Sequence, residues 1–209
     1  MGVFCAITLA RVGAPSRQRL VVMLKEPRPG RVKTRLGSDI GMVPAAWWFR
    51  HQTARLLRRI EDPRWDLILA VSPDHIGLNS RVWPAHLPRI PQGGGSLGDR
   101  MARIMRRMPP GPVCIIGGDI PGVTRAHIAR AFGALGDHGA VFGPAPDGGY
   151  WLTGLKRTAA VPVSLYQGVR WSSAHALRDS IATLPGVRVA LTDTLRDVDT
   201  AADLEIRAH

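Results

Sequence analysis

The chain alternates between short apolar runs and longer segments in which apolar residues recur every three or four positions. Short apolar runs bounded by turn-forming residues are typical of buried strands, and they occur at residues 20–24, 65–71, 113–116, 139–142, 150–153 and 187–191. The longer periodic segments predict helices at residues 43–60, 97–108, 124–135 and 172–184, and from Thr200 to the end of the chain. Thr124, Ser172 or Ser173, and Thr200 are expected to cap the last three of these helices. Residues 75–96 carry no clear periodicity and are expected to be mostly loop.

Strands that alternate with helices of this length imply βαβ units and a mostly parallel sheet. We therefore predict one α/β domain over residues 19–209, preceded by an N-terminal extension at residues 1–18. Ligands of such sheets bind beyond the carboxyl ends of the strands. The polar, glycine-rich segments 27–34, 117–122 and 144–149 all follow strands, so we expect them to converge on one cleft.

Composition narrows the class of protein. A length of 209 residues suits one domain, and no apolar run approaches the roughly 18 residues needed to span a bilayer. The apolar start lacks an early basic residue, unlike a signal peptide, so we expect a cytoplasmic protein without a membrane partner. The net charge of +12 fits an anionic partner but is also explained by a bias toward arginine. Cys5 and Cys114 show no metal-binding spacing.

The most informative stretch is Lys25-Glu-Pro-Arg-Pro-Gly-Arg-Val-Lys-Thr-Arg-Leu36, directly after the first predicted strand. It places several cations around a turn, with two of the three lysines in the chain among them. Gly30 permits close approach of a ligand, and two prolines lower the entropic cost of ordering the loop. Such fixed cations are typical of a polyphosphate site, although a solvated basic turn has the same composition.

Two standard nucleotide motifs do not fit. A P-loop requires glycine before the Lys33-Thr34 pair, and position 32 is valine. Gly93-Gly-Gly-Ser-Leu-Gly98 matches G-x-G-x-x-G, but the preceding residues 87–92 are interrupted by proline and do not predict the strand that a dinucleotide fingerprint needs. The histidines are scattered, and the sequence shows no Ser-His-Asp, Cys-His or H-E-x-x-H set.

Three acidic positions are candidates for metal or acceptor binding. Asp119 follows the third predicted strand, and Mg²⁺ is commonly bound by one or two carboxylates together with substrate phosphates. Asp199 could be the second ligand, with Asp197 and Asp147 as alternatives; a helix-capping role explains Asp199 equally well. Asp147-Gly-Gly-Tyr150 could hold an acceptor hydroxyl, or it could simply form a tight turn.

Six motifs in order resemble one family. They are Pro27-x-Pro-Gly30-x-x-Lys33-Thr-Arg-Leu36, Gln92-x-Gly-x-x-Leu97-Gly98-x-Arg100-Met101, Gly118-Asp119-x-Pro121, Pro144-Ala-x-Asp147-Gly-Gly-Tyr150, Val169-x-Trp171-Ser172 and Asp197-Val-Asp199-Thr200. Together they cover about residues 20–206. The chain thereby resembles the radical-SAM/selenodomain-associated transferase 1 family, a DUF2064 group similar to the GT-A glycosyltransferases.

The resemblance implies a Rossmann-like nucleotide-diphospho-sugar transferase fold, a three-layer αβα sandwich with a mixed, mostly parallel sheet. It also implies the roles of individual residues. The nucleotide would be bound by Leu24, Lys25, Pro29, Gly30, Lys33, Gln92 and Gly98. Mg²⁺ or Mn²⁺ would be held by Asp119 and Asp199. The acceptor would be bound by Asp147, Gly148, Gly149, Tyr150 and Trp171, and Lys33 and Arg35 would be catalytic.

The leading hypothesis is a nucleotidyltransferase that moves a nucleoside monophosphate from an NTP to a small phosphorylated or hydroxyl acceptor. A GT-A glycosyltransferase that uses an NDP-sugar would employ the same site. A basic nucleic-acid-binding module and a non-catalytic nucleotide-binding protein are further alternatives. The aromatic residues are scattered and no nucleic-acid motif appears, so a nucleic-acid partner is not expected. Either a monomer or a dimer is compatible with the sequence.

Overall fold

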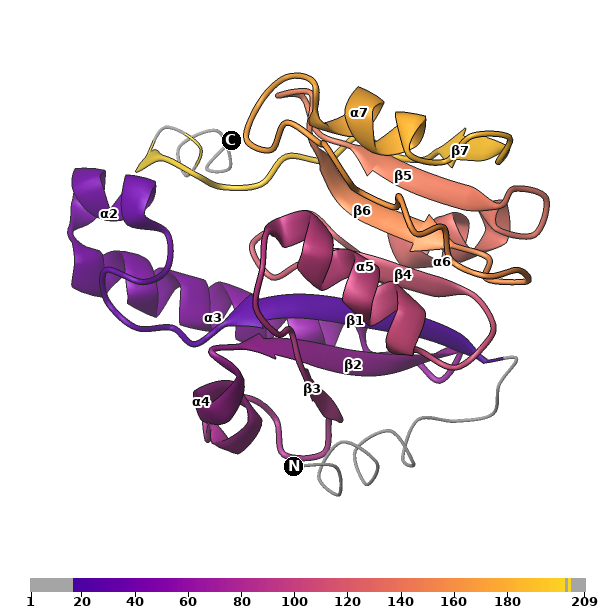
Figure 1. Ribbon diagram of the computed structural model, residues 1–209. Helices are drawn as coiled ribbons and strands as arrows, with labels where there is room; N and C mark the ends of the chain where they lie inside the picture. Colours follow the sequence, from indigo (N-terminus) through magenta and orange to yellow (C-terminus); the bar gives the residue numbers. More distant parts are fainter. Residues whose placement is uncertain (1–16, 202, 204–209) are drawn as a thin grey trace.

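One mixed sheet of seven strands organises the chain (Figure 1), and its spatial order is β3-β2-β1-β4-β6-β5-β7. The computed structural model describes residues 17–201 and residue 203. The strands are β1 Gln18–Lys25, β2 Trp65–Ser72, β3 Arg89–Pro91, β4 Val113–Gly117, β5 Ala140–Pro144, β6 Tyr150–Leu155 and β7 Val189–Leu191. All the strands predicted from the sequence are therefore present, the last in a shorter form.

The strand directions explain why distant loops meet. Strand β1 pairs in parallel with β2 and β4, β2 with β3, and β5 with β7. Strand β6 is antiparallel to both of its neighbours, β4 and β5. The carboxyl ends of the six parallel strands and the start of β6 consequently lie at one edge of the sheet. The segments that follow β1, β4, β5 and β7 converge there, as predicted.

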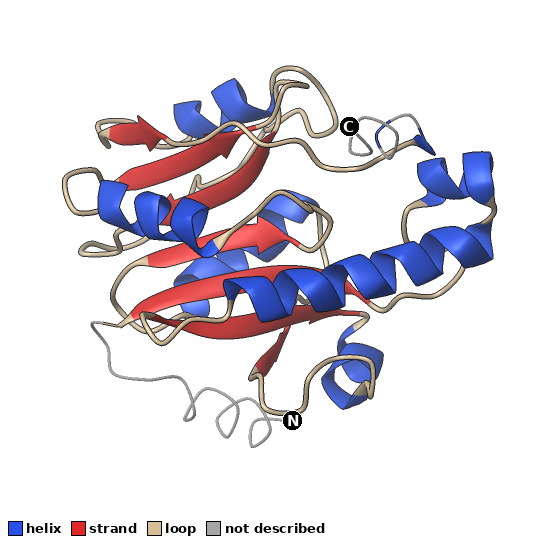
Figure 2. Ribbon diagram, turned by 180° about the vertical axis from the view of Figure 1, so that it is seen from behind, coloured by secondary structure: helices blue, strands red, loops and turns tan. Residues whose placement is uncertain are grey.

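Helices cover both faces of the sheet and give the three layers (Figures 1 and 2). On one face, residues of α3 (Met42–Ile60) and α6 (Arg125–Ala134) pack against Leu20, Val22 and Leu24 of β1. On the other face, α5 (Leu97–Arg107) and α7 (Ala176–Ala182) pack against Val21 and its neighbours. Successive side chains of β1 thus point alternately into two separate hydrophobic cores. The predicted αβα sandwich is confirmed.

Side-chain caps begin two of the helices. At α5, Ser96 accepts a hydrogen bond from the amide of Asp99, whose carboxylate accepts one from the amide of Ser96. Thr124 and His127 form the same reciprocal box at α6. Each box satisfies backbone donors that the first helical turn leaves without partners. The predicted cap at Thr124 is confirmed. Helix α5 begins directly after the glycine residues 93–95, and Ser96 is its N-cap residue.

Several short elements were not predicted. Helix α2 spans Thr34–Ile40, α4 spans Asp74–Asn79, and β3 lies within the segment expected to be loop. The argument that proline excludes a strand from residues 87–92 is wrong, because β3 is an edge strand of the sheet and proline is tolerated at edges. Helix α7 is shorter than expected and begins at Ala176, and its N-cap residue, His175, forms no side-chain cap. The predicted cap at Ser172 or Ser173 is therefore also wrong.

Both ends of the chain extend beyond the described part. The predicted extension lies almost wholly in residues 1–16, outside the described residues, and β1 already begins at Gln18. Near the other end, the amide and hydroxyl of Thr200 both donate hydrogen bonds to the carboxylate of Asp203. None of the helices in the described part has both the length and the apolar character needed to cross a membrane.

Candidate functional site

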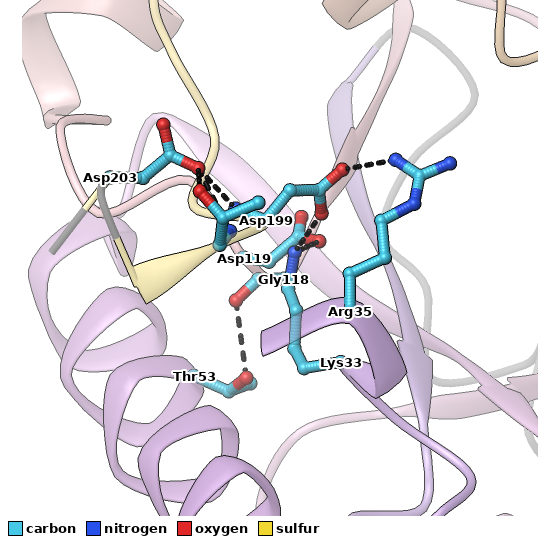
Figure 3. Close-up of polar contacts among 8 residues, drawn as sticks. Lys33, Arg35, Thr53, Gly118, Asp119, Asp199 and Asp203 are labelled. Atoms are coloured by element: carbon cyan, nitrogen blue, oxygen red, sulfur yellow. Dashed lines mark hydrogen bonds and ion pairs between the residues drawn. The ribbon is translucent and has the colours of Figure 1, made fainter. Parts of the chain in front are cut away.

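The cationic loop after β1 ends in an unusual backbone conformation. Lys33 precedes α2 with φ of 46° and ψ of 48°, in the left-handed region, and only 6% of its side chain is exposed. Its Nζ atom lies 2.6 Å from Oδ2 of Asp119 and 2.9 Å from Oδ1 of Asp199. The loop therefore turns its lysine inward, toward the ends of β4 and β7 (Figure 3). Arg35 remains exposed and binds the other oxygen of Asp199 at 3.0 Å.

Asp119 is held by the segment that follows β4. The buried hydroxyl of Thr53, on α3, donates a hydrogen bond of 3.1 Å to the carbonyl of Gly118 (Figure 3). The neighbouring Gly117 leaves room for the carboxylate, because a Cβ there would lie 2.8 Å from Oδ1 of Asp119. The helix and the two glycines together fix the direction in which Asp119 points.

Three carboxylates meet at this point. Single oxygen atoms of Asp119, Asp197 and Asp199 all lie within 4.8 Å of one another. Asp197 and Asp199 flank Val198, which is 1% exposed and anchors the segment in the core. The amide of Asp199 is bound by the carboxylate of Asp203 at 3.0 Å. We call Asp119, Asp197 and Asp199 the acidic triad.

The electrostatics show an excess of negative charge in the acidic triad. Burial and the nearby Asp119 and Asp199 carboxylates raise the pKa of Asp197 to about 6, even though Lys33 acts in the opposite direction. Burial alone would lower the pKa of Lys33, but its attraction to Asp119 and Asp199 outweighs burial and raises that pKa. The ammonium group thus compensates part of the negative charge of the triad, and room for more positive charge remains.

The acidic triad and Lys33 line a cleft of about 790 Å³ at the carboxyl edge of the sheet. This cleft is large enough for a drug-sized ligand. Of the residues predicted from the sequence, the cleft brings together Leu24, Lys25, Lys33, Arg35, Gln92, Asp119, Asp147, Gly149, Tyr150, Trp171 and Asp199. The predicted meeting of the cationic loop with Asp119 is therefore observed.

Four predicted residues do not line the cleft: Pro29, Gly30, Gly98 and Gly148. Gly98 is a packing position, since a Cβ there would lie 2.8 Å from the carbonyl oxygen of Tyr166 and 3.0 Å from the ring of Trp171. Gly30 and Gly148 adopt φ of 71° and 83°, so both serve the shapes of their turns. All four therefore remain predictions that lie outside the lining of the cleft.

Gln92 has a structural role in addition to its place in the cleft. Its buried amide nitrogen donates hydrogen bonds to the carbonyls of Leu24 at 3.0 Å and Ala70 at 2.8 Å. Both amide hydrogens are therefore used to join the ends of β1 and β2. Any contact of this side chain with a base would have to use its oxygen atom.

The opposite side of the cleft is aromatic. The ring of Tyr150 lies 6.3 Å from that of Trp171 and 5.1 Å from that of Phe142, in both cases edge to face. The Tyr150 hydroxyl accepts a hydrogen bond from Ser180 of α7, and burial raises the pKa of that phenol. Asp147 is exposed and accepts a bond from the amide of Gly149. This side can stack on a ring and can accept hydrogen bonds from hydroxyl groups.

Other lining residues were missed as site residues, namely Arg31, Arg100 and Thr153. Arg100 stands within one of the recognised motifs, and Arg31 lies inside the cationic loop, so both could have been found. Thr153 is a single polar residue in an apolar strand; its hydroxyl lies 2.7 Å from that of Tyr166. The sequence also left Asp197 as an alternative to Asp199, whereas the structure places both beside Asp119.

Comparisons with known proteins agree with this arrangement. A family model described as "Uncharacterized protein conserved in bacteria (DUF2064)" matches residues 55–173. A proposed nucleotide-diphospho-sugar transferase from Desulfovibrio desulfuricans G20 is 30% identical, covers 91% of this chain and 86% of its own, and gives a TM-score of 0.83. No protein with a curated description matches the chain in sequence.

More distant structures share the fold alone. CMP:2-keto-3-deoxy-manno-octonic acid synthetase, solved with CTP, is 12% identical over 92% of this chain and 98% of its own, with a TM-score of 0.56. Rv0371c from Mycobacterium tuberculosis H37Rv, solved with manganese, is 15% identical over 91% and 97%, with a TM-score of 0.54. The fold is therefore that of nucleotide-diphospho-sugar transferases and cytidylyltransferases.

Proposed function

Because the chain belongs to the DUF2064 family and has the fold of nucleotide-using transferases, we propose that it is a metal-dependent nucleotidyltransferase. It would transfer a nucleoside monophosphate from an NTP to a small acceptor with a phosphate or hydroxyl group. The observation that carries this proposal is the meeting of Lys33 with the acidic triad in one open cleft. Fixed cations beside grouped carboxylates are what a metal-chelated polyphosphate requires.

The acidic triad fits a hard divalent cation. Carboxylate oxygens are the ligands that Mg²⁺ and Mn²⁺ prefer, and burial, followed by the neighbouring carboxylates, raises the pKa of Asp197. Asp119, Asp197 and Asp199 would hold the ion, with Lys33 already occupying the position of a partial counter-charge. When bound, the ion would neutralise charge on the phosphates and orient them.

The residues of the chain would stabilise the charge that moves during transfer. An acceptor oxygen would attack the α-phosphorus, and the bond from that phosphorus to the bridging oxygen of pyrophosphate would break. Lys33 would contact the phosphoryl oxygens, while Arg35 at the mouth of the cleft would bind the leaving pyrophosphate. This is electrostatic catalysis by preorganised groups, the usual mode of phosphoryl-group chemistry.

The two sides of the cleft suggest which substrate binds where. Leu24 and Lys25 end β1 beside the cationic loop, so the nucleotide would lie on that side. Tyr150, Trp171 and Asp147 would bind the acceptor on the other side, by ring contact and by hydrogen bonds to hydroxyls. A nucleoside triphosphate donor is a cytoplasmic metabolite, so we place the enzyme in the cytoplasm.

A second candidate is glycosyl transfer from an NDP-sugar. It is favoured by the relative that is 30% identical and is named as a proposed nucleotide-diphospho-sugar transferase. The same cations and triad would then stabilise the departing nucleoside diphosphate. The bond that breaks would be the one between the sugar carbon and the phosphate oxygen.

One assay separates the two reactions when the natural acceptor is a sugar phosphate. The protein is incubated with Mg²⁺, radiolabelled pyrophosphate and a panel of NDP-sugars. A nucleotidyltransferase run in reverse joins pyrophosphate to the α-phosphorus, so labelled NTP and sugar phosphate appear. A glycosyltransferase, with water as the acceptor of the sugar, releases unlabelled NDP and free sugar instead. Thermal-shift screening of the NTPs and NDP-sugars with and without Mg²⁺ selects the panel, since a ligand at 100 times its Kd stabilises the fold by about 2.7 kcal/mol.

The matched control is Asp119→Asn, which keeps the size of the side chain and removes one metal ligand. Metal-dependent binding and turnover should both disappear in this variant. Nucleotide binding by the wild type that is indifferent to Mg²⁺ and to Asp119→Asn would refute a metal-dependent transferase. Binding that depends on both, without turnover of any NDP-sugar, would exclude nucleotidyl transfer to the sugar phosphates that the panel represents.

A further inference from the structure

Helix α2 and the first turns of α3 form a hairpin that projects from the body of the molecule (Figures 1 and 2). Its helices are in close contact, since a Cβ on Gly37 would lie 2.5 Å from the sulfur of Met42. Leu36 is fully buried within it. Gly41, with φ of 95°, makes the turn between the helices. The hairpin is therefore a packed element, and the side chains on its outer surface are held in place.

Exposed apolar side chains are concentrated in this hairpin. Among the described residues, the exposed large hydrophobic side chains are Ile40, Met42, Val43, Trp47, Leu97, Val163 and Leu191. The first four fall within eight residues, and Trp47 and Val43 are 62% and 55% exposed. Single exposed hydrophobic residues need no explanation, but a group of them marks an interaction site. We call Ile40, Met42, Val43 and Trp47 the apolar tip.

The surroundings of the apolar tip are strongly basic. Helices α2 and α3 contain five arginines and one acidic residue, Asp39, which already accepts a hydrogen bond from the amide of Ala201. Along α3, helical spacing places Trp47, Arg50, His51 and Arg58 on the outward face, and all four are exposed. The outward face thus combines an exposed tryptophan with arginines, and basic side chains near a surface are attracted to anionic lipids.

We propose that the apolar tip and the arginines of α3 dock the protein on an anionic lipid surface. The aliphatic groups and the Trp47 ring would enter the interface, while Arg50 and Arg58 bind lipid phosphates. A second copy of the chain is a less favourable partner. In a two-fold contact the same surface meets itself, so the arginines of the two copies would repel each other. A nucleic acid would use the arginines but would leave the aliphatic side chains in water.

Docking on a lipid surface is contrary to the expectation that the protein has no membrane partner. That expectation rested only on the lack of a membrane-spanning run and of a signal-peptide pattern. Docking would also determine where the cleft lies relative to the lipid surface. Thr34 and Arg35, in the first turn of α2, line the cleft, and Ile40 ends the same helix about 8–9 Å away at 1.5 Å per residue. Docking at the tip would thus hold the mouth of the cleft near the lipid surface.

Vesicle flotation with the full-length protein tests the proposal. Vesicles of equimolar phosphatidylglycerol and phosphatidylcholine are compared with vesicles of phosphatidylcholine alone. The double variant Val43→Ser with Trp47→Ser should bind the anionic vesicles at least about tenfold more weakly, since both side chains lose the apolar area they would bury. Its matched control is Val163→Ser with Leu191→Ser, which removes two exposed apolar side chains elsewhere and should bind like the wild type.

A second pair of variants tests the charges. Arg50→Gln with Arg58→Gln should weaken anionic binding severalfold, whereas Arg81→Gln with Arg178→Gln, an equal change in net charge at other exposed arginines, should have a much smaller effect. All these side chains are exposed, so the melting temperatures should match that of the wild type. Equal losses in a test variant and its control would show unspecific attraction and overturn the proposal.

Other outcomes would assign the surface to another partner. A wild-type protein that ignores anionic vesicles, or binds neutral ones equally well, overturns the proposal. A dimer in light scattering that dissociates in Val43→Ser with Trp47→Ser would identify a second copy as the occupant. Tight binding to duplex DNA that depends on Arg50 and Arg58 but not on Trp47 would identify a nucleic acid. None of these measurements depends on the proposed transferase activity, so the two proposals can fail independently.

Discussion

Replacing Lys33 with methionine should have opposite effects on metal binding and on catalysis. In the structure, the Lys33 ammonium occupies the space beside Asp119 and Asp199, at 2.6 and 2.9 Å. A metal ion that binds to the acidic triad must displace this ammonium group or share the carboxylates with it. Nucleotide phosphates provide an alternative partner for Lys33. Metal and nucleotide should therefore bind cooperatively in the wild type, each strengthening the other by the same factor.

The magnitude follows from the two ion pairs. Hydrogen bonds to charged groups contribute about 1.5–3 kcal/mol each. Asp119 and Asp199 are 29% and 41% exposed, so solvent screens both contacts, and we assign about 1.5–3 kcal/mol to the pair together. Since 1.4 kcal/mol is a factor of ten, Lys33→Met should bind Mn²⁺ about 10- to 100-fold more tightly than the wild type when no nucleotide is present. Catalysis should fall by about 100-fold or more in kcat/KM, because a preorganised charge is lost from the phosphates.

Titration of Mn²⁺, followed by electron paramagnetic resonance, measures the Kd with and without nucleotide. Lys25→Met is the matched control, because Lys25 lines the same cleft but is exposed and makes no ion pair among the described residues. It should change the Mn²⁺ affinity little. A Lys33→Met protein that binds Mn²⁺ no more tightly than Lys25→Met would refute the idea that Lys33 is a counter-charge which the metal replaces.

Three further outcomes are expected. Asp119→Asn should lose the Mg²⁺-dependent part of the thermal stabilisation given by a bound nucleotide, and an unchanged shift would exclude it as a ligand. Gly98→Ala should destabilise the fold by about 1–3 kcal/mol in urea, because its Cβ would meet the Tyr166 backbone at 2.8 Å, whereas Gly94→Ala, with open space around it, should not. Hydrogen bonds from an arginine lower the pKa of Asp62 to about 2, so its stabilisation exists above about pH 4 and is lost as the pH falls toward 2; urea denaturation of Asp62→Asn should show a smaller loss over that range.

The sequence was sufficient for elements with a strong pattern. Strand β1 and helix α3 are long, continuous and buried on defined faces, so periodicity located them. The short elements α2, α4 and β3 were missed for a common reason: their three to seven residues are too few to show a period. They form because neighbouring structure supports them. Helix α2 exists because Gly37 allows it to pack on Met42, a contact that becomes visible only in three dimensions.

The sequence predicted which residues form the candidate site better than it predicted how they are arranged. Parallel strands bring their carboxyl ends to one edge, so the approach of Lys33 to Asp119 followed from the shared direction of the strands. The sequence treated Asp197 and Asp199 as alternatives, yet Val198 between them is an apolar residue that requires burial. Anchoring Val198 in the core turns both flanking carboxylates toward the cleft, and all three acids then share one position. The Asp-Val-Asp pattern already contained this signal. The sequence contained no signal for the left-handed backbone of Lys33. Non-glycine residues adopt this conformation only where surrounding contacts hold them there. In this protein the two carboxylates and the packed α2–α3 hairpin provide those contacts.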